Sequence, residues 1–289
     1  MKGRFVVACL LALAGALASA EDAVKLEPNA KLSFEFPDLP ETFFSKATHQ
    51  PAPALLTAQL PENYVPGGRF PLFVFLGGGN GGRGDSTTAR SIAGPRDFIA
   101  VSLPLFRDST AAAAPVLPGL PINPKEMVNG ADAGILGRAY RVMLQRLLEA
   151  VPNVTRERSA FGGFSNGAHA TGALLAAKDE FVLSHFTAFC FFEGGMPLLL
   201  NPAALDQPAL RHGRLIVLFG DSDPNPQLQL ARKLLAGPLL EKLSQEASTL
   251  ELDFTHITMH GYGHTMPPEY QKLLGAWVRG EKLPEIPVK

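Results

Sequence analysis

The chain has 289 residues, of which 46% are hydrophobic and 18% charged, and its formal net charge at pH 7 is −1. This length and hydrophobic content allow one large domain with a substantial core. A charge so close to zero argues against a nucleic-acid-binding surface, and the presence of only two cysteines excludes a disulfide-rich scaffold.

Residues 1–20 have the pattern of a signal peptide. Lys2 and Arg4 form a charged start, residues 5–17 are an apolar run, and the small residues 18–20 resemble a cleavage site. The apolar run is too short to span a bilayer, and no later segment reaches about 18 consecutive apolar residues. We therefore expect a secreted or periplasmic protein with no membrane span.

Residues 21–60 are predicted to form an N-terminal extension ahead of the main domain, residues 61–289. Two probable edge strands, residues 32–36 and 55–60, lie in this proline-punctuated extension, and the first alternates apolar and polar residues. No internal repeat, low-complexity tract or domain linker is found within the main domain.

The main domain alternates apolar strands with helices. Continuous apolar runs, typical of strands covered on both faces, occur at residues 70–76, 98–103, 188–192 and 215–219. A longer alternating strand is expected at residues 250–259. Helices are expected at residues 129–151, 166–177, 227–235, 239–246 and 267–278. This order predicts an α/β fold with a mainly parallel sheet and helices on both faces.

Residues 163–167 read GFSNG and fit the G-x-S-x-G nucleophile elbow. A short apolar strand led in by Arg158 precedes them, and a small-residue helix follows. A serine on such a sharp turn has a strained backbone, and the residues two before and two after it would collide with neighbouring backbone unless they lack a Cβ. Ser165 is thus a candidate nucleophile, and a chance match in a chain with 28 glycines is the alternative.

A serine nucleophile needs a base, and the base needs an orienting acid. His264 lies in a glycine-rich loop between the last strand and the last helix, where its ring can reach the carboxyl edge of the sheet. It is the favoured base, whereas His169 is expected to pack or to support the site. His256, His260 and His264 are spaced by four, but their segment alternates as a strand, so we expect no metal site.

Three carboxylates are candidates for the acid because each follows a buried strand. Asp221 and Asp223 follow residues 215–219, and Glu193 follows residues 188–192. Asp223 is favoured since it reaches further into its loop. Asp221 is placed to bond the turn backbone instead, and Glu193 stays open as the third candidate.

Residues 77–82, a glycine-rich run after the first buried strand, are a candidate oxyanion loop. Glycines let backbone N–H groups approach a developing negative charge closely. The run does not fit the phosphate-binding pattern, which fails at Arg83 and Gly84. A simple turn is the alternative interpretation.

The order of glycine-rich loop, serine, aspartate and histidine resembles the α/β-hydrolase superfamily, from about Pro61 to Val278. The resemblance is greatest to secreted esterases of the polyhydroxybutyrate-depolymerase-like, feruloyl-esterase-like and dienelactone-hydrolase-like groups. In those proteins a histidine usually precedes the glycines, and Gly77 stands in its place here. The resemblance implies the α/β-hydrolase fold and no cofactor. It also implies a triad of Ser165, Asp223 and His264, with oxyanion donors in the backbone N–H groups of Gly79 or Asn80 and of Asn166.

The sequence therefore favours a secreted serine hydrolase that cleaves a small-molecule or polymeric carboxylic ester through an acyl-enzyme on Ser165. A peptidase or thioesterase on the same scaffold is an alternative, as is a non-catalytic binding protein with this fold, because fold alone does not imply activity. The loop at residues 104–124 is expected to form a wall of the site. The pattern identifies neither the acyl nor the alcohol part of the substrate, nor an oligomeric state.

Overall fold

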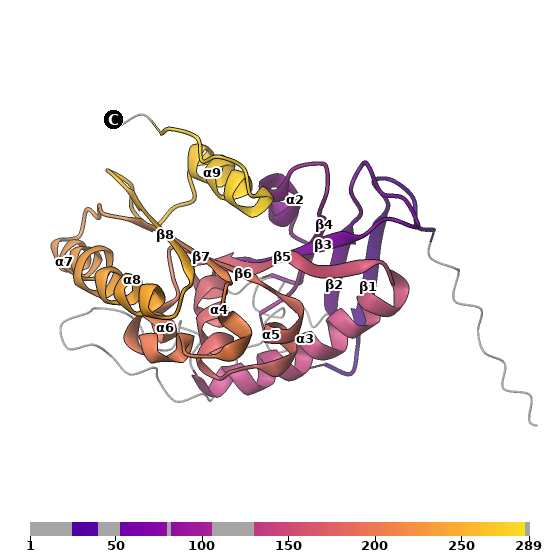
Figure 1. The fold of residues 1–289 in the computed structure, drawn as a ribbon, viewed down its shortest axis with the longest axis horizontal. Helices are drawn as coiled ribbons and strands as arrows, with labels where there is room; N and C mark the ends of the chain where they lie inside the picture. The colour runs from indigo at the N-terminus through magenta and orange to yellow at the C-terminus, as the bar shows by residue number, and fades with distance from the viewer. Residues whose placement is uncertain (1–24, 40–52, 80–81, 106–129, 287–289) are drawn as a thin grey trace, which may run out of the picture.

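A computed structural model describes residues 25–39, 53–79, 82–105 and 130–286 (Figure 1). The predicted signal peptide and nearly all of the loop expected at residues 104–124 lie outside these ranges. Within them, eight strands form one sheet in the order β1-β2-β4-β3-β5-β6-β7-β8. The strands are β1 (Lys31–Phe36), β2 (Ala54–Gln59), β3 (Phe70–Leu76), β4 (Ile99–Ser102), β5 (Val154–Phe164), β6 (Ala188–Phe192), β7 (Arg214–Gly220) and β8 (Asp253–Met259).

Helices cover both faces of this sheet (Figure 1). One face carries α2 (Thr88–Ala93) and α9 (Pro268–Arg279). The other carries α3 (Gly130–Ala150), α4 (Asn166–Ala176), α5 (Glu180–His185), α6 (Met196–Leu200), α7 (Pro226–Leu234) and α8 (Leu240–Thr249), with short 3₁₀ turns at Pro202–Leu205 and Pro208–Leu210. Strand β2 runs antiparallel to β1 and β4, and the other strand pairs are parallel. The predicted α/β class, with a mainly parallel sheet between helices, is confirmed.

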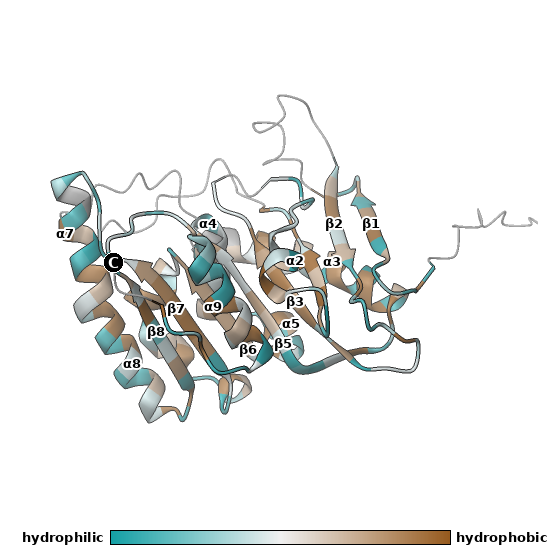
Figure 2. Ribbon diagram, turned by 90° about the horizontal axis from the view of Figure 1, so that it is seen from above, coloured by the Kyte–Doolittle hydropathy of each residue, from teal (hydrophilic) through white to brown (hydrophobic). Residues whose placement is uncertain are grey.

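Two apolar layers, one on each face of the sheet, form the core. Along β3, Leu72, Val74 and Leu76 face the α3–α4 layer, whereas Phe73 and Phe75 face the α2–α9 layer. Figure 2 shows the matching pattern in colour, with apolar central strands and an α8 that alternates between apolar and polar residues. Apolar side chains spaced by three or four along α3 and the residue after it are fully buried: Leu136, Tyr140, Met143, Leu147 and Val151.

The structure differs from the predicted elements in several places. The short strand expected after Arg158 is the longer β5, which already begins at Val154. Strand β1 forms an edge, but β2 lies between β1 and β4, so the two strands of the N-terminal extension join the main sheet. The helix break expected near residue 235 is a π-helical turn, Leu235–Leu239, because Pro238 lacks the N–H that an α-helical ladder needs. Helices α2, α5 and α6 were not expected, since five or six residues are too few for a visible period. The division at residue 60 stays a prediction.

No helix within the described ranges is long and apolar enough to cross a membrane.

An irregularity between β3 and β5 shapes the strand that carries Ser165. Pro71 pairs with Thr155 and Phe73 with Ala160, so β5 advances five residues while β3 advances two. The fully buried Ser159 closes this bulge. Its hydroxyl donates to the Thr155 carbonyl oxygen at 2.7 Å and accepts from the Leu72 N–H at 2.8 Å. One side chain therefore satisfies two backbone groups that the ladder leaves unpaired.

Replacing Ser159 by alanine should lower the free energy of unfolding by about 1–3 kcal/mol, because the buried Leu72 N–H loses its acceptor. Urea denaturation followed by circular dichroism measures this change. Ser248→Ala, at an exposed position on α8, is the matched control and should stay within about 0.5 kcal/mol of the wild type. A Ser159→Ala chain as stable as the control would contradict the role given to the hydroxyl.

Candidate active site

Ser165 lies at the junction of β5 and α4 with φ 54° and ψ −118°, a conformation that non-glycine residues rarely adopt. A Cβ on Gly163 would come within 2.5 Å of the Gly167 carbonyl carbon, and one on Gly167 would lie 2.4 Å from the Leu76 oxygen. Neither distance is possible for a real side chain. This confirms the reason given for glycine two residues before and two residues after the serine.

The imidazole of His264 contacts the serine hydroxyl, as expected for a base. Its Nε2 lies 2.8 Å from Ser165 Oγ. The ring is about half exposed and stacks on Phe164, with ring centroids 5.1 Å apart. The backbone loop between β8 and α9 thus carries His264 over the end of β5.

A carboxylate faces the other nitrogen of the ring, but it is not that of Asp223. His264 Nδ1 lies 3.3 Å from Glu193 Oε2, directly after β6. The Asp223 carboxylate instead accepts from Arg232 Nε at 3.2 Å and from the Asn225 N–H at 3.0 Å. The structure therefore brings His264 to the third candidate acid. The physical reason is that Glu193 follows β6, which lies next to β5, whereas Asp223 follows β7, one strand further away.

Several donors hold the Glu193 carboxylate in place. Its side chain is fully buried; Oε2 accepts from Arg232 Nη1 at 2.7 Å, and Oε1 accepts from the Gly220 N–H at 2.5 Å. The same Arg232 nitrogen also donates to the Gly220 carbonyl oxygen at 3.1 Å. A buried carboxylate needs such pairing to stay charged. Glu193 is thereby presented to His264 with little freedom to turn away.

Arg232 joins the two carboxylates and was not found from the sequence. It lies on α7 with its side chain only 8% exposed, between Glu193 and Asp223. The Asn225 N–H lowers the pKa of Asp223, burial opposes this, and Arg232 and the charge of His264 lower it further, so that the pKa lies below its ordinary value. On α7, Arg232 lies one turn after Gln229. The Gln229 side chain bonds the backbone of Asp221 and Asp223, in the loop that follows β7.

Asp221 bonds the turn backbone, which is the role that the sequence predicted for it in place of the acid. Its carboxylate accepts from the Gly261 N–H at 2.8 Å and contacts His260 Nδ1 at 2.7 Å. Burial raises the pKa of Asp221, but the bonds from His260 and Gly261 outweigh it and leave the pKa below its ordinary value. Asp221 thus fixes the start of the loop that carries His264.

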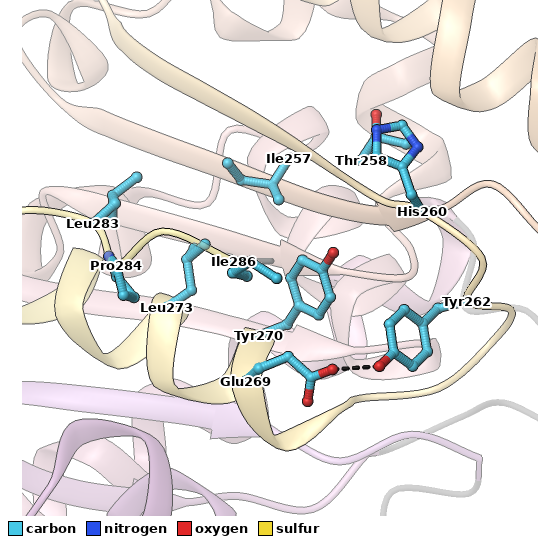
Figure 3. A pocket seen from close by; sticks show the side chains of 10 residues that line it. All are labelled: Ile257, Thr258, His260, Tyr262, Glu269, Tyr270, Leu273, Leu283, Pro284 and Ile286. Carbon is cyan, nitrogen blue, oxygen red and sulfur yellow. Dashed lines mark hydrogen bonds between the residues drawn. The ribbon is translucent and has the colours of Figure 1, made fainter. Parts of the chain in front are cut away.

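A cavity of about 230 Å³ lies beside this loop, between β8, α9 and the C-terminal segment (Figure 3). At its polar end the Tyr262 hydroxyl donates to the Glu269 carboxylate, and the Tyr262 ring meets Tyr270 edge to face at 5.7 Å. Apolar side chains, among them Leu273 and Leu283, line the other end. The contacts at the polar end tie the loop to the first turn of α9.

The glycine-rich run after β3 lies against the elbow. A Cβ on Gly78 would be 2.7 Å from the Phe164 ring and 3.1 Å from the Ser165 Cβ. Gly79 has a φ of 62°, where side chains are disfavoured. The predicted oxyanion loop therefore lies close to Ser165, the candidate nucleophile.

A side-chain amide braces this loop. Asn166 Nδ2 donates to the Gly79 carbonyl oxygen at 2.7 Å, so the residue after the nucleophile holds the loop from the opposite side. Asn80, the other expected donor, lies outside the described residues.

His256 and His260 lie in and just after β8, on the N-terminal side of His264. In the part of the chain that the structure describes, no three His, Cys, Asp or Glu side chains converge in a way that could hold a metal ion. His256 projects from β8 toward solvent and contacts Thr258, whereas His260 pairs with Asp221. Their spacing of four therefore reflects neither a helix nor a shared ligand.

No protein-family model matches the chain, and no curated protein matches its sequence. Solved structures match its fold. The poly(3-hydroxybutyrate) depolymerase LpqC from Bordetella parapertussis has 17% identity and a TM-score of 0.52, over 89% of this chain and 92% of that protein. A feruloyl esterase module from Clostridium thermocellum, solved with sinapinate, has 14% identity and a TM-score of 0.52, over 90% and 91%. The protein TT1662 from Thermus thermophilus has 16% identity and a TM-score of 0.52, over 87% and 98%.

Other matches are to longer proteins. The chain spans 59% of a thermostable esterase, at a TM-score of 0.48, and 35% of a protein from Bacteroides ovatus, at a TM-score of 0.47. At identities this low, the better matches bear on the fold alone. Together with the sheet order and the strained turn after β5, they show that the chain has the α/β-hydrolase fold, as the sequence resemblance predicted.

Proposed function

We propose that this protein is a serine hydrolase of carboxylic esters, with Ser165 as nucleophile, His264 as base and Glu193 as the acid that orients His264. One observation carries the proposal: the 2.8 Å contact between Ser165 Oγ and His264 Nε2 on a strained strand-to-helix turn. A serine, an imidazole and a carboxylate joined in this order are the requirements for activating a hydroxyl.

The proposed reaction proceeds through an acyl-enzyme. Ser165 Oγ attacks the ester carbonyl carbon while His264 Nε2 takes the hydroxyl proton. The resulting oxyanion is stabilised by backbone N–H groups of Gly79 or Asn80 and of Asn166. Collapse of this intermediate breaks the bond to the alcohol, which leaves with the proton from His264. Water, deprotonated by the same imidazole, then releases the acid and restores Ser165.

The choice of Glu193 over Asp223 rests on contact and on charge. Glu193 Oε2 is the carboxylate oxygen within reach of His264 Nδ1, at 3.3 Å, and it is fully buried. A buried carboxylate stabilises the imidazolium more strongly than a solvated one because less water screens the pair. In this proposal Asp223 acts on the site through Arg232 and through its longer-range attraction to His264.

The substrate is proposed to be a small-molecule or polymeric ester. The sequence resemblance to secreted esterases supports this class, as do structural neighbours described as a depolymerase and a feruloyl esterase. The pattern of residues 1–20 supports export to a secreted or periplasmic location. A formal charge of −1 gives no support for nucleic acid as a partner.

Wild-type protein should be labelled covalently on Ser165 by a fluorophosphonate probe, and Ser165→Ala should lose ester turnover by about 10⁶-fold, as when other triad serines are removed. Mass spectrometry identifies the labelled peptide, and a panel of acetyl, feruloyl and medium-chain esters measures turnover. Thioester and peptide substrates in the same panel test the alternative reactions. Absence of labelling in the wild type would indicate a non-catalytic binding protein, and a Ser165→Ala variant with a tenth of the activity would contradict the nucleophile.

Glu193→Gln should lower kcat by about 10⁴-fold, because an amide favours the wrong imidazole tautomer and no longer offsets its positive charge. Asp223→Asn and Asp221→Asn are the matched controls and should lose far less. Steady-state kinetics gives the comparison, and circular dichroism melts check that Glu193→Gln remains folded despite the buried Arg232. If Asp223→Asn is the more damaging variant, Asp223 is the acid, as first predicted from the sequence.

Asn166→Ala should lower kcat by up to about 10²-fold, because the Gly79 carbonyl loses its brace and the oxyanion donors lose their position. KM should change modestly, since the ground-state carbonyl carries little charge. Alanine keeps the helix stable at this position, so melting should be unaffected. Asn201→Ala, an exposed asparagine without a capping bond, serves as control, and equal kcat in the two variants would mean that Asn166 does not hold the loop.

A further inference from the structure

We propose that His169 is a positioning residue of this site: its Nδ1 accepts hydrogen bonds from the Gly195 and Met196 N–H groups and so fixes the turn that carries Glu193. The inference rests on the proposed hydrolase function. His169 is 9% exposed and is not needed as a proton carrier in the reaction above. Its place in the fold nevertheless connects the nucleophile to the acid.

The backbone of His169 is fixed to the elbow. It lies one turn along α4, and its N–H donates to the Ser165 carbonyl oxygen at 3.0 Å. A displacement of Ser165 is therefore passed to the ring of His169, because the two residues share the first turn of one helix.

The side chain of His169 reaches the turn after β6. Nδ1 accepts from the Gly195 N–H at 3.0 Å and from the Met196 N–H at 3.1 Å. These N–H groups stand at the start of α6, where a helix leaves its first donors without internal partners. Gly195 has a φ of 100°, and this left-handed conformation helps to turn both donors toward one acceptor.

The same turn sets the position of Glu193 and has little freedom. Glu193 has a φ of 57°, and its N–H donates to the Leu218 carbonyl oxygen at 2.9 Å. A Cβ on Gly194 would lie 2.5 Å from the Ser165 carbonyl oxygen. The turn is thus pressed against α4, and the ring of His169 is the side chain that ties its far end to that helix.

This role needs a histidine that does not take up a proton. Only an unprotonated Nδ1 can accept two hydrogen bonds. Burial, and then the charge of His264, lower the pKa of His169 to about 3. The acceptor is therefore kept at neutral pH, even though His264 becomes positively charged during the proposed reaction.

Three substitutions of His169 distinguish the loss of its hydrogen-bond acceptor from the loss of its side-chain volume. Asn places its carbonyl oxygen near the position of Nδ1, Gln places its amide near Nε2, and Leu has the branched shape of Asn without an acceptor. We expect His169→Leu to lower kcat by roughly 10²-fold, the effect of a displacement of about 1 Å in a catalytic group, with little change in KM. We expect His169→Asn to recover most of this loss and His169→Gln to recover little.

Two readouts distinguish positioning from a purely structural role. In His169→Leu the acid limb of the kcat/KM profile should move to lower pH, because a displaced Glu193 stabilises the imidazolium less. In a Glu193→Gln background the same substitution should change the rate by no more than about twofold, since its target is already lost. His256→Leu, at an exposed position in the middle of β8, is the control expected to match the wild type.

The outcomes separate this inference from the proposed function. Wild-type protein that is not labelled by fluorophosphonate overturns both. If the wild type is labelled and His169→Leu is labelled at the same rate, the hydrolase stands and the positioning role is overturned. Equal losses in the Asn and Leu variants, or a full loss added on top of Glu193→Gln, also overturn it. A lowered melting temperature with unchanged kcat assigns His169 to stability alone.

Discussion

The close approach of three backbone segments at Ser165 is the constraint on which the site depends. The absence of a Cβ at Gly163 and Gly167 lets α4 begin against the end of β3, and the absence of one at Gly194 lets the turn after β6 lie against the Ser165 carbonyl. A serine with positive φ stores roughly 1–3 kcal/mol of strain, which the bond from its N–H to the Phe192 carbonyl helps to offset. The glycine-rich loop and the turn carrying Glu193 therefore both pack against the first turn of α4.

Charge in this region is arranged around one buried guanidinium. Arg232 lies between the carboxylates of Glu193 and Asp223, so the group carries one more negative than positive charge. Protonation of His264 by Ser165 would bring the sum to zero. A buried ion pair alone gives little net stability because desolvation is expensive. An excess negative charge next to the imidazole nevertheless stabilises an imidazolium in the transition state. This charge cluster would therefore contribute more to the proposed catalysis than to the stability of the fold.

Much of the fold could be predicted from the sequence because burial on both faces leaves a direct pattern. Strands β3 and β6 match their predicted bounds to the residue, since each is a continuous apolar run that ends at a glycine or at polar residues. Short helices such as α5 left no period to detect, although Asp179 caps it as a standard N-cap. Strand order was not predictable either. The position of β2 beside β4 depends on long-range pairing that no local pattern contains.

Within the site, the sequence predicted the serine and the histidine, whereas the choice of acid depends on the tertiary structure. Ser165 and His264 follow from a motif and from chain order, and the structure brings them together. The ends of parallel strands meet at one edge of the sheet, so strand-end reasoning alone could not separate Glu193 from Asp223. The difference between them is strand position: Glu193 follows β6, next to the strand that leads to Ser165, whereas Asp223 follows β7. Arg232 on α7 bonds both, Asp223 with Nε and Glu193 with Nη1. The pairing of one arginine with both carboxylates is a tertiary arrangement that no local pattern contains, so the choice between Glu193 and Asp223 could not be made from the sequence.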